Sequence, residues 1–560
     1  MVKTHRGGIM CGIIAFYQKS PLKLESQKSI IESSLKKMSH RGPDESHIYQ
    51  SSDFSKGLGH TRLSIIDPSF GAQPFLWEDL QWIHNGEIYN HAHFREEEFK
   101  SLFDQSDLSL SDSAIIGPLY KKYGTDFVSK LDGVFSIVIL DGDKIIAARD
   151  PLGVKPLFYG FDDEERMWFA SEMKALSSHC REIHTFPPGT LYTSDEGFIR
   201  YYEPQWFESK EALGPFTLQD KDQIKELLRD KLVTATKKRL MTDVPLGALL
   251  SGGLDSSLVA AIAARELKKT GKRLTTFSVG LKAGTHDLLS AAKVAEFIGS
   301  DHKEIIFDVE EGISLLRTMI TLLETFDVTT IRASTPMFIM SKVIRDLGYK
   351  VVLSGEGADE IFGGYLYFSH APSADEFQKE CVRRIKRLHT SDLLRADRST
   401  MGASVEARVP FLDKAFLDVA MSIDPSLKMI RREEGRCEKW ILRSSFSEES
   451  LIPDEILWRQ KEQFSDGVGY SWVDGLKEYA ESIISDADFS KREELFPYLT
   501  PTTKEAFLYR KIFSEVHPHG DIAKQAKRWI PKWQDYDVDP SGRANDSHTS
   551  TYHPLEKLEA

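Results

Sequence analysis

Cysteine is scarce in this chain. Its 560 residues include four cysteines, Cys11, Cys180, Cys381 and Cys437, and no Cys-x-x-Cys pair. This spacing favours neither a disulfide framework nor a zinc site. We therefore expect a protein of a reducing compartment, the cytoplasm.

Long apolar runs are missing as well. The longest, such as residues 135–140, fall far short of the roughly 20 residues that a membrane-spanning helix needs. The start, MVKTHRGGIMCGII, lacks the extended apolar stretch and small-residue cleavage site of a secretory signal. We expect neither a membrane span nor secretion.

Positive charge is in deficit. The chain has 72 Lys and Arg against 85 Asp and Glu, a net charge of −13. Binding to nucleic-acid phosphates needs clustered Lys and Arg, so we expect no nucleic-acid partner. A small anionic substrate is still compatible, because one local site can be basic on an acidic protein. The 41% hydrophobic and 28% charged residues are typical of a folded globular chain.

The hydrophobic pattern divides the chain into two folded regions. Residues 11–206 alternate short apolar runs with few helices, which predicts a sheet-rich α+β domain; strands are expected at 58–66 and 81–84, and Asp141-Gly142-Asp143 predicts a hairpin. The polar stretch 207–225 predicts a linker. In residues 226–530 apolar runs alternate with helical patterns, which predicts a parallel, doubly wound α/β sheet with added helices beyond about residue 371. The polar residues 531–560 predict a poorly ordered tail.

A glycine-rich loop follows the strand predicted to end at Leu250. It reads Ser251-Gly252-Gly253-Leu254-Asp255-Ser256-Ser257 and leads into a helix. Glycines let the backbone approach a ligand, and the free N–H groups of a helix start can hold an anion. A bare phosphate would repel Asp255, so its presence indicates a bridging Mg²⁺. Alone, the motif fits a capped turn as well as a phosphate site.

A second acidic, glycine-rich loop favours the phosphate site. Ser354, Gly355, Glu356 and Asp359 follow a strand predicted at residues 349–353. Parallel sheets bind ligands where the carboxyl ends of neighbouring strands meet. Asp255 and Asp359 could share metal ions there, and a strand at 275–281 could place Val279 beside a nucleotide base.

These loops resemble those of a known family. The loop at 251–257 is similar to the pyrophosphate loop of ATP pyrophosphatases, and SGEGADEIFGGY narrows the resemblance to asparagine synthetases. Residues 324–337, 407–414 and 458–472 are similar to the same family. The resemblance runs from Cys11 to about residue 545. It looks closest to the glutamine-hydrolysing enzymes of the bacterial B type and their eukaryotic relatives.

The resemblance implies that residues 11–206 form a class II glutamine amidotransferase, an Ntn hydrolase of αββα layers. It makes Cys11 an N-terminal nucleophile whose own α-amine is the base, and Asn85 and Gly86 the donors to the oxyanion. The glutamine site it implies comprises Arg62, Leu63, Ser64, Ile65, Ile66, Asn85, Gly86, Glu87 and Asp112. From the residues alone, Ser111 or Asp112 caps a helix that stops at Gly124; for Asp112 both roles can coexist.

Ten residues precede Cys11, and an amide-bonded Cys11 lacks the free α-amine. Three interpretations remain open. Translation starts at Met10 and the Met is removed, a short propeptide is cleaved, or the glutaminase is inactive and the enzyme uses ammonia. The first is favoured.

For residues 226–530 the resemblance implies an ATP-pyrophosphatase domain that amidates aspartate through β-aspartyl-AMP. The products are asparagine, glutamate, AMP and pyrophosphate. Glu356 is implied as the base for ammonia, and an apolar tunnel is expected to carry the ammonia from Cys11. A homodimer is a family expectation only. The implied ligands are, for ATP, Leu250, Ser251, Gly252, Gly253, Asp255, Ser256, Ser257, Val279, Ser354, Gly355 and Lys461; for aspartate, Thr329, Thr330 and Arg332; and for Mg²⁺, Asp255 and Asp359.

Three other functions compete with this hypothesis. A β-lactam synthetase typically lacks a working nucleophilic Cys, and a phosphoribosyl-pyrophosphate amidotransferase lacks the loop at 251–257. A glutamine-binding regulatory protein with a decayed synthetase half is disfavoured by the intact Asp255, Glu356 and Asp359.

Overall fold

The computed structural model describes residues 11–19, 27–42, 44–105, 109–207, 218–281, 285–461 and 467–533. Four sequence predictions fall wholly or partly outside these residues. They are the extension at 1–10, part of the linker at 208–217, residues 462–466 of the motif at 458–472, and nearly all of the tail.

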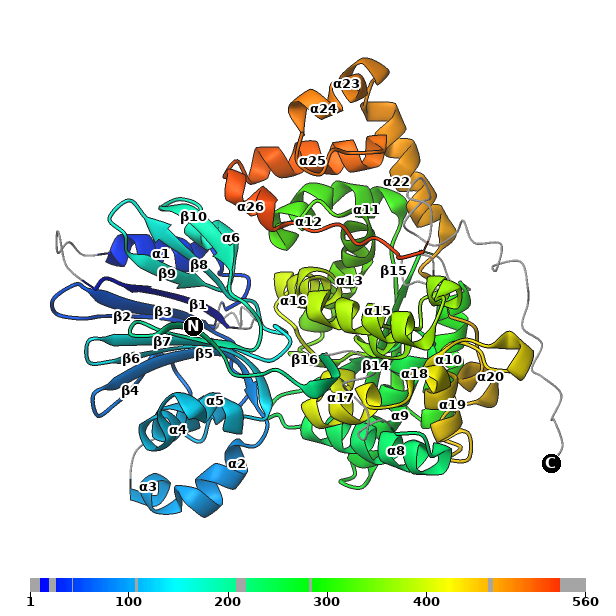
Figure 1. The fold of residues 1–560 in the computed structure, drawn as a ribbon, viewed down its shortest axis with the longest axis horizontal. Helices are drawn as coiled ribbons and strands as arrows, with labels where there is room; N and C mark the ends of the chain where they lie inside the picture. Colours follow the sequence, from blue (N-terminus) through cyan, green and yellow to red (C-terminus); the bar gives the residue numbers. More distant parts are fainter. Residues whose placement is uncertain are drawn as a thin grey trace, which may run out of the picture.

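Two six-stranded sheets stack in the N-terminal half of the chain (Figure 1). Their strand orders are β10-β8-β9-β1-β3-β2 and β12-β11-β7-β6-β5-β4, and neighbouring strands are antiparallel. The strands are β1 Gly12–Tyr17, β2 Glu45–Gln50, β3 Lys56–Arg62, β4 Phe75–Trp77, β5 Leu80–Ile88, β6 Gly133–Asp141, β7 Lys144–Arg149, β8 Phe158–Asp162, β9 Met167–Ala170, β10 Cys180–Thr185, β11 Thr190–Thr193 and β12 Gly197–Arg200.

Helices cover the outer face of each sheet (Figure 1). Successive side chains of a strand point to opposite faces, so Ile13 packs between the sheets while Ile14 packs against Leu35 of α1. On the other sheet Trp82 packs against Leu119 of α4. The four layers confirm the predicted αββα fold. The helices of this half are α1 Lys28–Lys37, α2 His91–His93, α3 Lys100–Gln105, α4 Ile116–Tyr123, α5 Phe127–Lys130 and α6 Met173–Leu176, with a π-turn at Phe94–Glu98 and 3₁₀ turns at Asp112–Ile115, Gly124–Asp126 and Gln205–Phe207.

The strands of this half differ in length from the predictions. The hairpin at Gly142 is confirmed: Asp141 pairs with Lys144, and Gly142 has φ of 53°. Strand β3 ends at Arg62, so residues 63–66 lie beyond it. Strand β5 continues past the expected 81–84 and carries Asn85 and Gly86 within it.

The C-terminal half is built on a five-stranded sheet of order β15-β14-β13-β16-β17, in which every pair is parallel. This confirms the α/β prediction. The chain runs from β13 outward to β15 and then crosses back to β16, so the topological switch point lies between β13 and β16. Such switch points open a crevice at the carboxyl ends of the strands. The strands are β13 Leu246–Leu249, β14 Thr275–Gly280, β15 Asp301–Ile306, β16 Val351–Leu353 and β17 Glu406–Arg408.

Helices flank this sheet and form most of the chain after β16 (Figure 1). In the view of Figure 1, α22 to α26 form the upper part of this half. The helices are α8 Lys221–Lys238, α9 Leu254–Lys268, α10 His286–Ile298, α11 Val309–Ser314, α12 Leu316–Leu323, α13 Val328–Asp346, α14 Ala358–Phe362, α15 Ala374–Arg387, α16 Asp392–Gly402, α17 Lys414–Met421, α18 Pro425–Lys428, α19 Trp440–Phe446, α20 Asp454–Leu457, α22 Tyr470–Ile483, α23 Asp486–Ser490, α24 Arg492–Leu495, α25 Lys504–Val516 and α26 Gly520–Gln525.

Two elements of this half depart from the sequence prediction. Strand β17 lies in a region expected to be helical. Helix α8 begins at Lys221, inside the stretch 207–225 expected to be linker, because the Asp220 carboxylate accepts the N–H of Gln223 at 2.8 Å and caps the helix.

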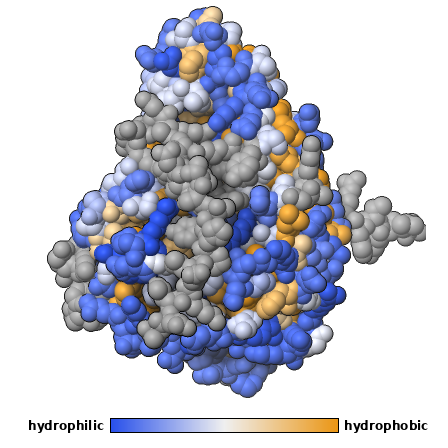
Figure 2. All heavy atoms as spheres, turned by 90° about the vertical axis from the view of Figure 1, so that its right-hand side faces the viewer, coloured by the Kyte–Doolittle hydropathy of each residue, from blue (hydrophilic) through white to orange (hydrophobic). Residues whose placement is uncertain are grey.

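The surface of the C-terminal half is mainly hydrophilic in the view of Figure 2, with hydrophobic residues in small groups. Among the residues that the structure describes, no helix combines the length and the apolar character needed to cross a membrane.

Removing the cap of α8 should destabilise the protein. Asp220→Ala leaves the Gln223 N–H without its acceptor, and we expect a loss of about 1 kcal/mol in the free energy of unfolding. Thermal unfolding followed by circular dichroism measures this. Asp220→Asn keeps an acceptor oxygen and should unfold close to the wild-type temperature; equal losses in both variants would contradict the capping role.

Candidate functional site

Cys11 directly precedes β1 in the N-terminal half of the chain. Its Sγ is 4.0 Å from the Leu63 carbonyl oxygen, and its own carbonyl accepts the Nε–H of Arg41 at 3.2 Å. Burial raises the pKa of the Cys11 thiol to about 12. The thiol is therefore protonated at neutral pH and needs a base before it can act as a nucleophile.

Asn85 and Gly86 lie side by side near the end of β5. The Asn85 side chain is fully buried, and neither its Oδ1 nor its Nδ2 has a hydrogen-bond partner among the described residues. An unsatisfied buried amide costs about 1–3 kcal/mol, so this amide is suited to a ligand oxygen. Gly86 has φ of 144°, and a Cβ there would lie 1.9 Å from the Val134 carbonyl oxygen. No other residue fits at Gly86.

Residues 62–66 connect Cys11 to the boundary between the halves. The Arg62 guanidinium donates to the carbonyls of Asp67 at 2.7 Å and Pro68 at 3.1 Å. The Ser64 N–H donates to the Asp44 carboxylate at 3.3 Å. A small apolar cluster then crosses between the halves, and it comprises Leu63, Ile65, Ile66 and Cys11 together with Val244, Leu246, Val351 and Met401.

Asp112 is buried behind β5. Its Oδ2 accepts the Ile88 N–H at 2.8 Å, and burial raises the pKa of its carboxyl to about 6. The sequence allowed either Ser111 or Asp112 as the helix cap. The structure shows that the cap is Ser111, whose Oγ accepts the Ser113 N–H. Asp112 therefore braces β5 instead of capping the helix.

Glu87 faces charged residues that sequence reasoning missed. Its Oε1 lies 2.8 Å from Nη2 of Arg408 on β17, and Arg408 also donates to Glu406, which pairs with Lys155 at 2.8 Å. All four side chains are buried. Burial raises the pKa of Glu87, and Arg408 opposes this shift. A possible signal was the pair of charges at 406 and 408 between Val405 and Val409.

The two glycine-rich loops meet at the switch point of the parallel sheet. Gly252 has φ of 72°, and a Cβ there would lie 2.5 Å from the Ala291 nitrogen. A Cβ on Gly355 would lie 2.7 Å from the Ser256 nitrogen. Ser251 and Ser256 hydrogen-bond to each other at 3.0 Å. Gly355 therefore lets the second loop lie against the first, whereas Gly252 lets the first loop lie against α10.

A cavity of about 140 Å³ opens at this point. It joins a smaller one through shared walls at Ser251, Asp255, Ser256, Asp287 and Lys461, and Gly253 lines that second cavity. Ser257 is fully buried and lines neither. The predicted residues that line the larger cavity are Leu250, Ser251, Asp255, Ser256, Val279, Thr329, Thr330, Ser354, Gly355, Glu356, Asp359 and Lys461.

Arg332 does not line this cavity, contrary to its predicted role toward aspartate. It is buried against α25, where its Nε and Nη2 lie 2.8 and 2.5 Å from the two carboxylate oxygens of Glu505. A different arginine, Arg395 on α16, lines the cavity. No local pattern of residues points to Arg395, because only the packing of α16 brings it to the loop at 354–359.

Glu356 forms an ion pair with Arg395 in the cavity. Its Oε2 accepts Nη2 of Arg395 at 2.7 Å, and the same nitrogen is 3.2 Å from Oδ1 of Asp392. Burial raises the pKa of Glu356, although Arg395 opposes this shift. A carboxylate with a raised pKa is suited to exchanging a proton near neutral pH.

Two lysines form ion pairs with Asp255 and Asp359, the carboxylates predicted to bind Mg²⁺. Lys439 Nζ lies 2.5 Å from Asp255 Oδ2 and 2.6 Å from Asp359 Oδ1, and Lys461 Nζ lies 2.7 Å from Asp359 Oδ2. Although burial favours the neutral acid, the two ammonium groups hold the pKa of Asp359 well below its usual value. The described residues contain no cluster of three metal-ligating side chains. Among the described residues, however, the buried Asp255 Oδ1 has no hydrogen-bond partner, which fits a Mg²⁺ completed by phosphate oxygens.

Comparison with known proteins agrees with this geometry. Residues 227–376 and 369–534 match the family described as Asparagine synthase, and residues 10–196 match the Glutamine amidotransferase domain. A probable glutamine-hydrolysing asparagine synthetase of Dictyostelium discoideum is 47% identical over 97% of this chain and 100% of its own length. Glutamine-hydrolysing asparagine synthetases of Zea mays and Arabidopsis thaliana are 47% and 46% identical, over 97% and 96% of this chain and 94% and 93% of theirs.

These relatives are eukaryotic, so they do not support the expected closeness to the bacterial B type. The matched families span both halves, and the identity extends over nearly all of the chain. The protein is therefore a member of the asparagine synthetase family.

Proposed function

We propose that the protein makes asparagine from aspartate and ATP, with nitrogen from glutamine, and releases glutamate, AMP and pyrophosphate. The observation that carries this proposal is the cavity at the switch point, where the loop at 251–257 meets Glu356, Lys461 and Arg395. The names of the relatives support it. Homodimerisation, a cytoplasmic location and the absence of a nucleic-acid partner are further parts of the proposal.

In the amidotransferase half, Cys11 Sγ attacks the carboxamide carbon of glutamine. The thiol proton passes to the α-amine of Cys11, which requires that Cys11 be the first residue of the working chain. The Nδ2 of Asn85, which has no partner among the described residues, and the backbone N–H of Gly86 would stabilise the oxyanion. The Cys11 α-ammonium then passes this proton to the leaving nitrogen, ammonia departs, and water hydrolyses the thioester to glutamate and regenerates the thiol. In this proposal Arg62 and Asp112 hold the α-carboxylate and α-ammonium of glutamine.

The ammonia needs a path that keeps it from being protonated in bulk water. The apolar cluster that contains Cys11, Leu63, Val351 and Met401 supports such a path, because it begins at the nucleophile and reaches β16. The far end of β16 leads into Ser354 and Glu356. We propose that ammonia crosses along this cluster.

In the synthetase half, the β-carboxylate of aspartate attacks the α-phosphorus of ATP and pyrophosphate leaves. Lys461 and Lys439 would stabilise the charge on the leaving group. Mg²⁺, held by Asp255 and Asp359, would offset the phosphate charge when bound. Glu356 would accept a proton from ammonia as it attacks the β-aspartyl-AMP. Because Arg332 is paired with Glu505, we assign the α-carboxylate of aspartate to Arg395, with Thr329 and Thr330 beside it.

Product analysis tests the proposed function directly. The full chain with aspartate and ATP-Mg²⁺ should give asparagine, AMP and pyrophosphate with either glutamine or ammonium, and N-terminal sequencing of that preparation should begin at Cys11. Product from ammonium alone would reject the glutaminase and keep the synthetase. No asparagine from either nitrogen source would reject the proposal.

Removing the Asn85 amide should separate the two activities. Asn85→Ala deletes a donor to the oxyanion, so we expect glutamine hydrolysis to fall by about 10²–10³-fold while synthesis from ammonium persists. Steady-state rates with each nitrogen source measure this. Asn90→Ala is the matched control: its amide already donates to the Lys130 carbonyl at 2.9 Å, so glutamine hydrolysis should stay near wild type. A similar loss in both variants would point to folding instead of catalysis.

The pH dependence of synthesis should report on Glu356. A base must be deprotonated, so the rate should be lost as the pH falls through the pKa of Glu356, which burial raises above 4.5. Glu356→Gln should remove this acidic limb and lower kcat for ammonium-dependent synthesis by about 10²–10⁴-fold. Profiles are measured at a fixed concentration of un-ionised ammonia. Glu360→Gln alters another buried carboxyl of the cavity and should keep the acidic limb of the pH profile. If the limb disappears in Glu360→Gln but not in Glu356→Gln, the base is Glu360 and not Glu356.

A further inference from the structure

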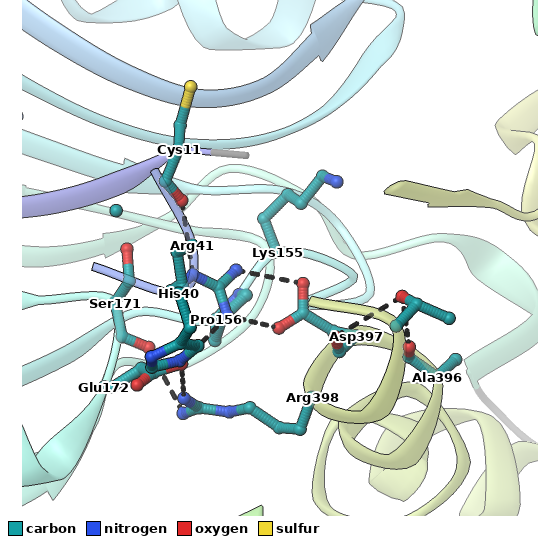
Figure 3. A network of polar contacts seen from close by, with 12 residues as sticks. Cys11, His40, Arg41, Lys155, Pro156, Ser171, Glu172, Ala396, Asp397 and Arg398 are labelled. Atoms are coloured by element: carbon teal, nitrogen blue, oxygen red, sulfur yellow. Dashed lines mark hydrogen bonds and ion pairs between the residues drawn. The ribbon is translucent and has the colours of Figure 1, made fainter. Parts of the chain in front are cut away.

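Helix α16 lies between the two sites. Toward the cavity, Arg395 donates to Glu356 at 2.7 Å, and Asp392 also lines the cavity. Two residues rotate an α-helix by roughly 200°, so Asp397 projects from nearly the opposite side of α16. There its Oδ2 and Oδ1 accept Nη1 and Nη2 of Arg41 at 2.8 and 3.1 Å (Figure 3).

Arg41 continues the connection to the nucleophile. Its third nitrogen, Nε, donates to the Cys11 carbonyl oxygen at 3.2 Å, and Figure 3 shows Arg41 between Cys11 and Asp397. Hydrogen bonds and one helix therefore link Glu356 to Cys11 without a gap. The links in order are Glu356, Arg395, α16, Asp397, Arg41 and Cys11.

The surroundings of this connection are buried and charged. The Arg41 side chain is fully buried and Asp397 nearly so. Arg398, also on α16, lies 2.5 Å from Glu172 Oε1, which accepts Arg41 Nη1 at 3.1 Å (Figure 3). Since water does not reach these groups, a shift of α16 cannot be absorbed by solvent. It must instead move Arg41 or break a buried ion pair, which is costly.

We propose that Asp397 is a positioning residue that couples the ATP–aspartate cavity to the glutaminase nucleophile through α16 and Arg41. The inference rests on the proposed function. The anionic groups of the substrates compete with Glu356 and Asp392 for the N–H groups of Arg395, and the new pairing displaces α16. Asp397 moves with α16 and shifts Arg41 through their ion pair. Arg41 in turn shifts the Cys11 backbone through its hydrogen bond to the Cys11 carbonyl. Glutamine hydrolysis is thereby favoured when an acceptor for ammonia is present.

Coupling of this kind is reciprocal for binding. If ATP and aspartate raise the affinity for glutamine, glutamine must raise the affinity for ATP and aspartate by the same factor. A residue that only supports the fold would weaken both activities and leave the factor unchanged. The coupling factor therefore separates a positioning role from a structural one.

The test compares kcat/KM for glutamine hydrolysis with and without ATP-Mg²⁺ and aspartate. In the wild-type chain we expect a stimulation on the order of 5–150-fold. Asp397→Asn keeps the side-chain volume but removes the charge through which α16 holds Arg41, while Glu172 still pairs with Arg41. The stimulation of this variant should fall close to one while ammonium-dependent synthesis is retained. In a Cys11→Ala background, where glutamine is not hydrolysed, glutamine should tighten ATP-Mg²⁺ binding measured by calorimetry, and Asp397→Asn should abolish that effect.

Two variants serve as controls. Asp132→Asn breaks another ion pair between the halves, Asp132 Oδ2 to Lys238 Nζ at 2.6 Å, and should keep the wild-type stimulation. Asp397→Glu retains the carboxylate and should restore part of the coupling.

Several results would overturn the coupling: an unstimulated wild type, full stimulation in Asp397→Asn, equal loss in Asp132→Asn, or loss of ammonium-dependent synthesis in Asp397→Asn. No ammonium-dependent synthesis in the wild type would instead overturn the proposed function and the coupling with it.

Discussion

Buried charges at the boundary between the two halves fix how the sites face each other. Arg41 and Arg398 meet Glu172 and Asp397 there, and Arg408 meets Glu87 nearby. Taking such groups out of water is expensive, so these pairs contribute little net stability. Their contribution is to geometry. Separating any of these pairs would leave a buried charge without a partner, so one arrangement of the two halves is strongly favoured over others. The positions of Cys11 and of the ATP cavity relative to each other depend on that arrangement.

Each half uses its fold to present backbone and side-chain groups at a strand end. In the N-terminal half, β5 carries Asn85, whose amide has no partner in the part of the chain that the structure describes, beside a glycine that tolerates no Cβ. In the C-terminal half, Gly355 lets its loop touch the loop at 251–257, and Gly252 lets that loop lie against α10. Close approach of backbone is thus the common requirement, and glycine meets it because it has no side chain to displace. The chemistry is then supplied by neighbouring charged groups that the fold buries.

Much of the architecture could be predicted because it is encoded locally. Strand periodicity and the Asp-Gly turn identified the hairpin at Gly142, and the alternation of strands and helices identified the parallel sheet. Short, charged elements could not be predicted in this way. Strand β17 carries Glu406 and Arg408, residue types that seldom form a buried strand, and only ion pairs with Lys155 and Glu87 allow them to be buried there. Helix α8 began earlier than expected because a single cap, at Asp220, decides where it starts.

The sequence by itself determined the family, the fold class and the motifs at Cys11, 251–257 and 354–359, because each lies in a contiguous stretch whose residue types suit one chemistry. The tertiary structure alone decided that Arg332 is paired with Glu505 and that Arg395 lines the cavity instead. It also decided that Asp397 reaches Arg41, 356 positions away in the chain. A long-range ion pair depends on which helices pack together, and no local pattern of residues specifies that contact.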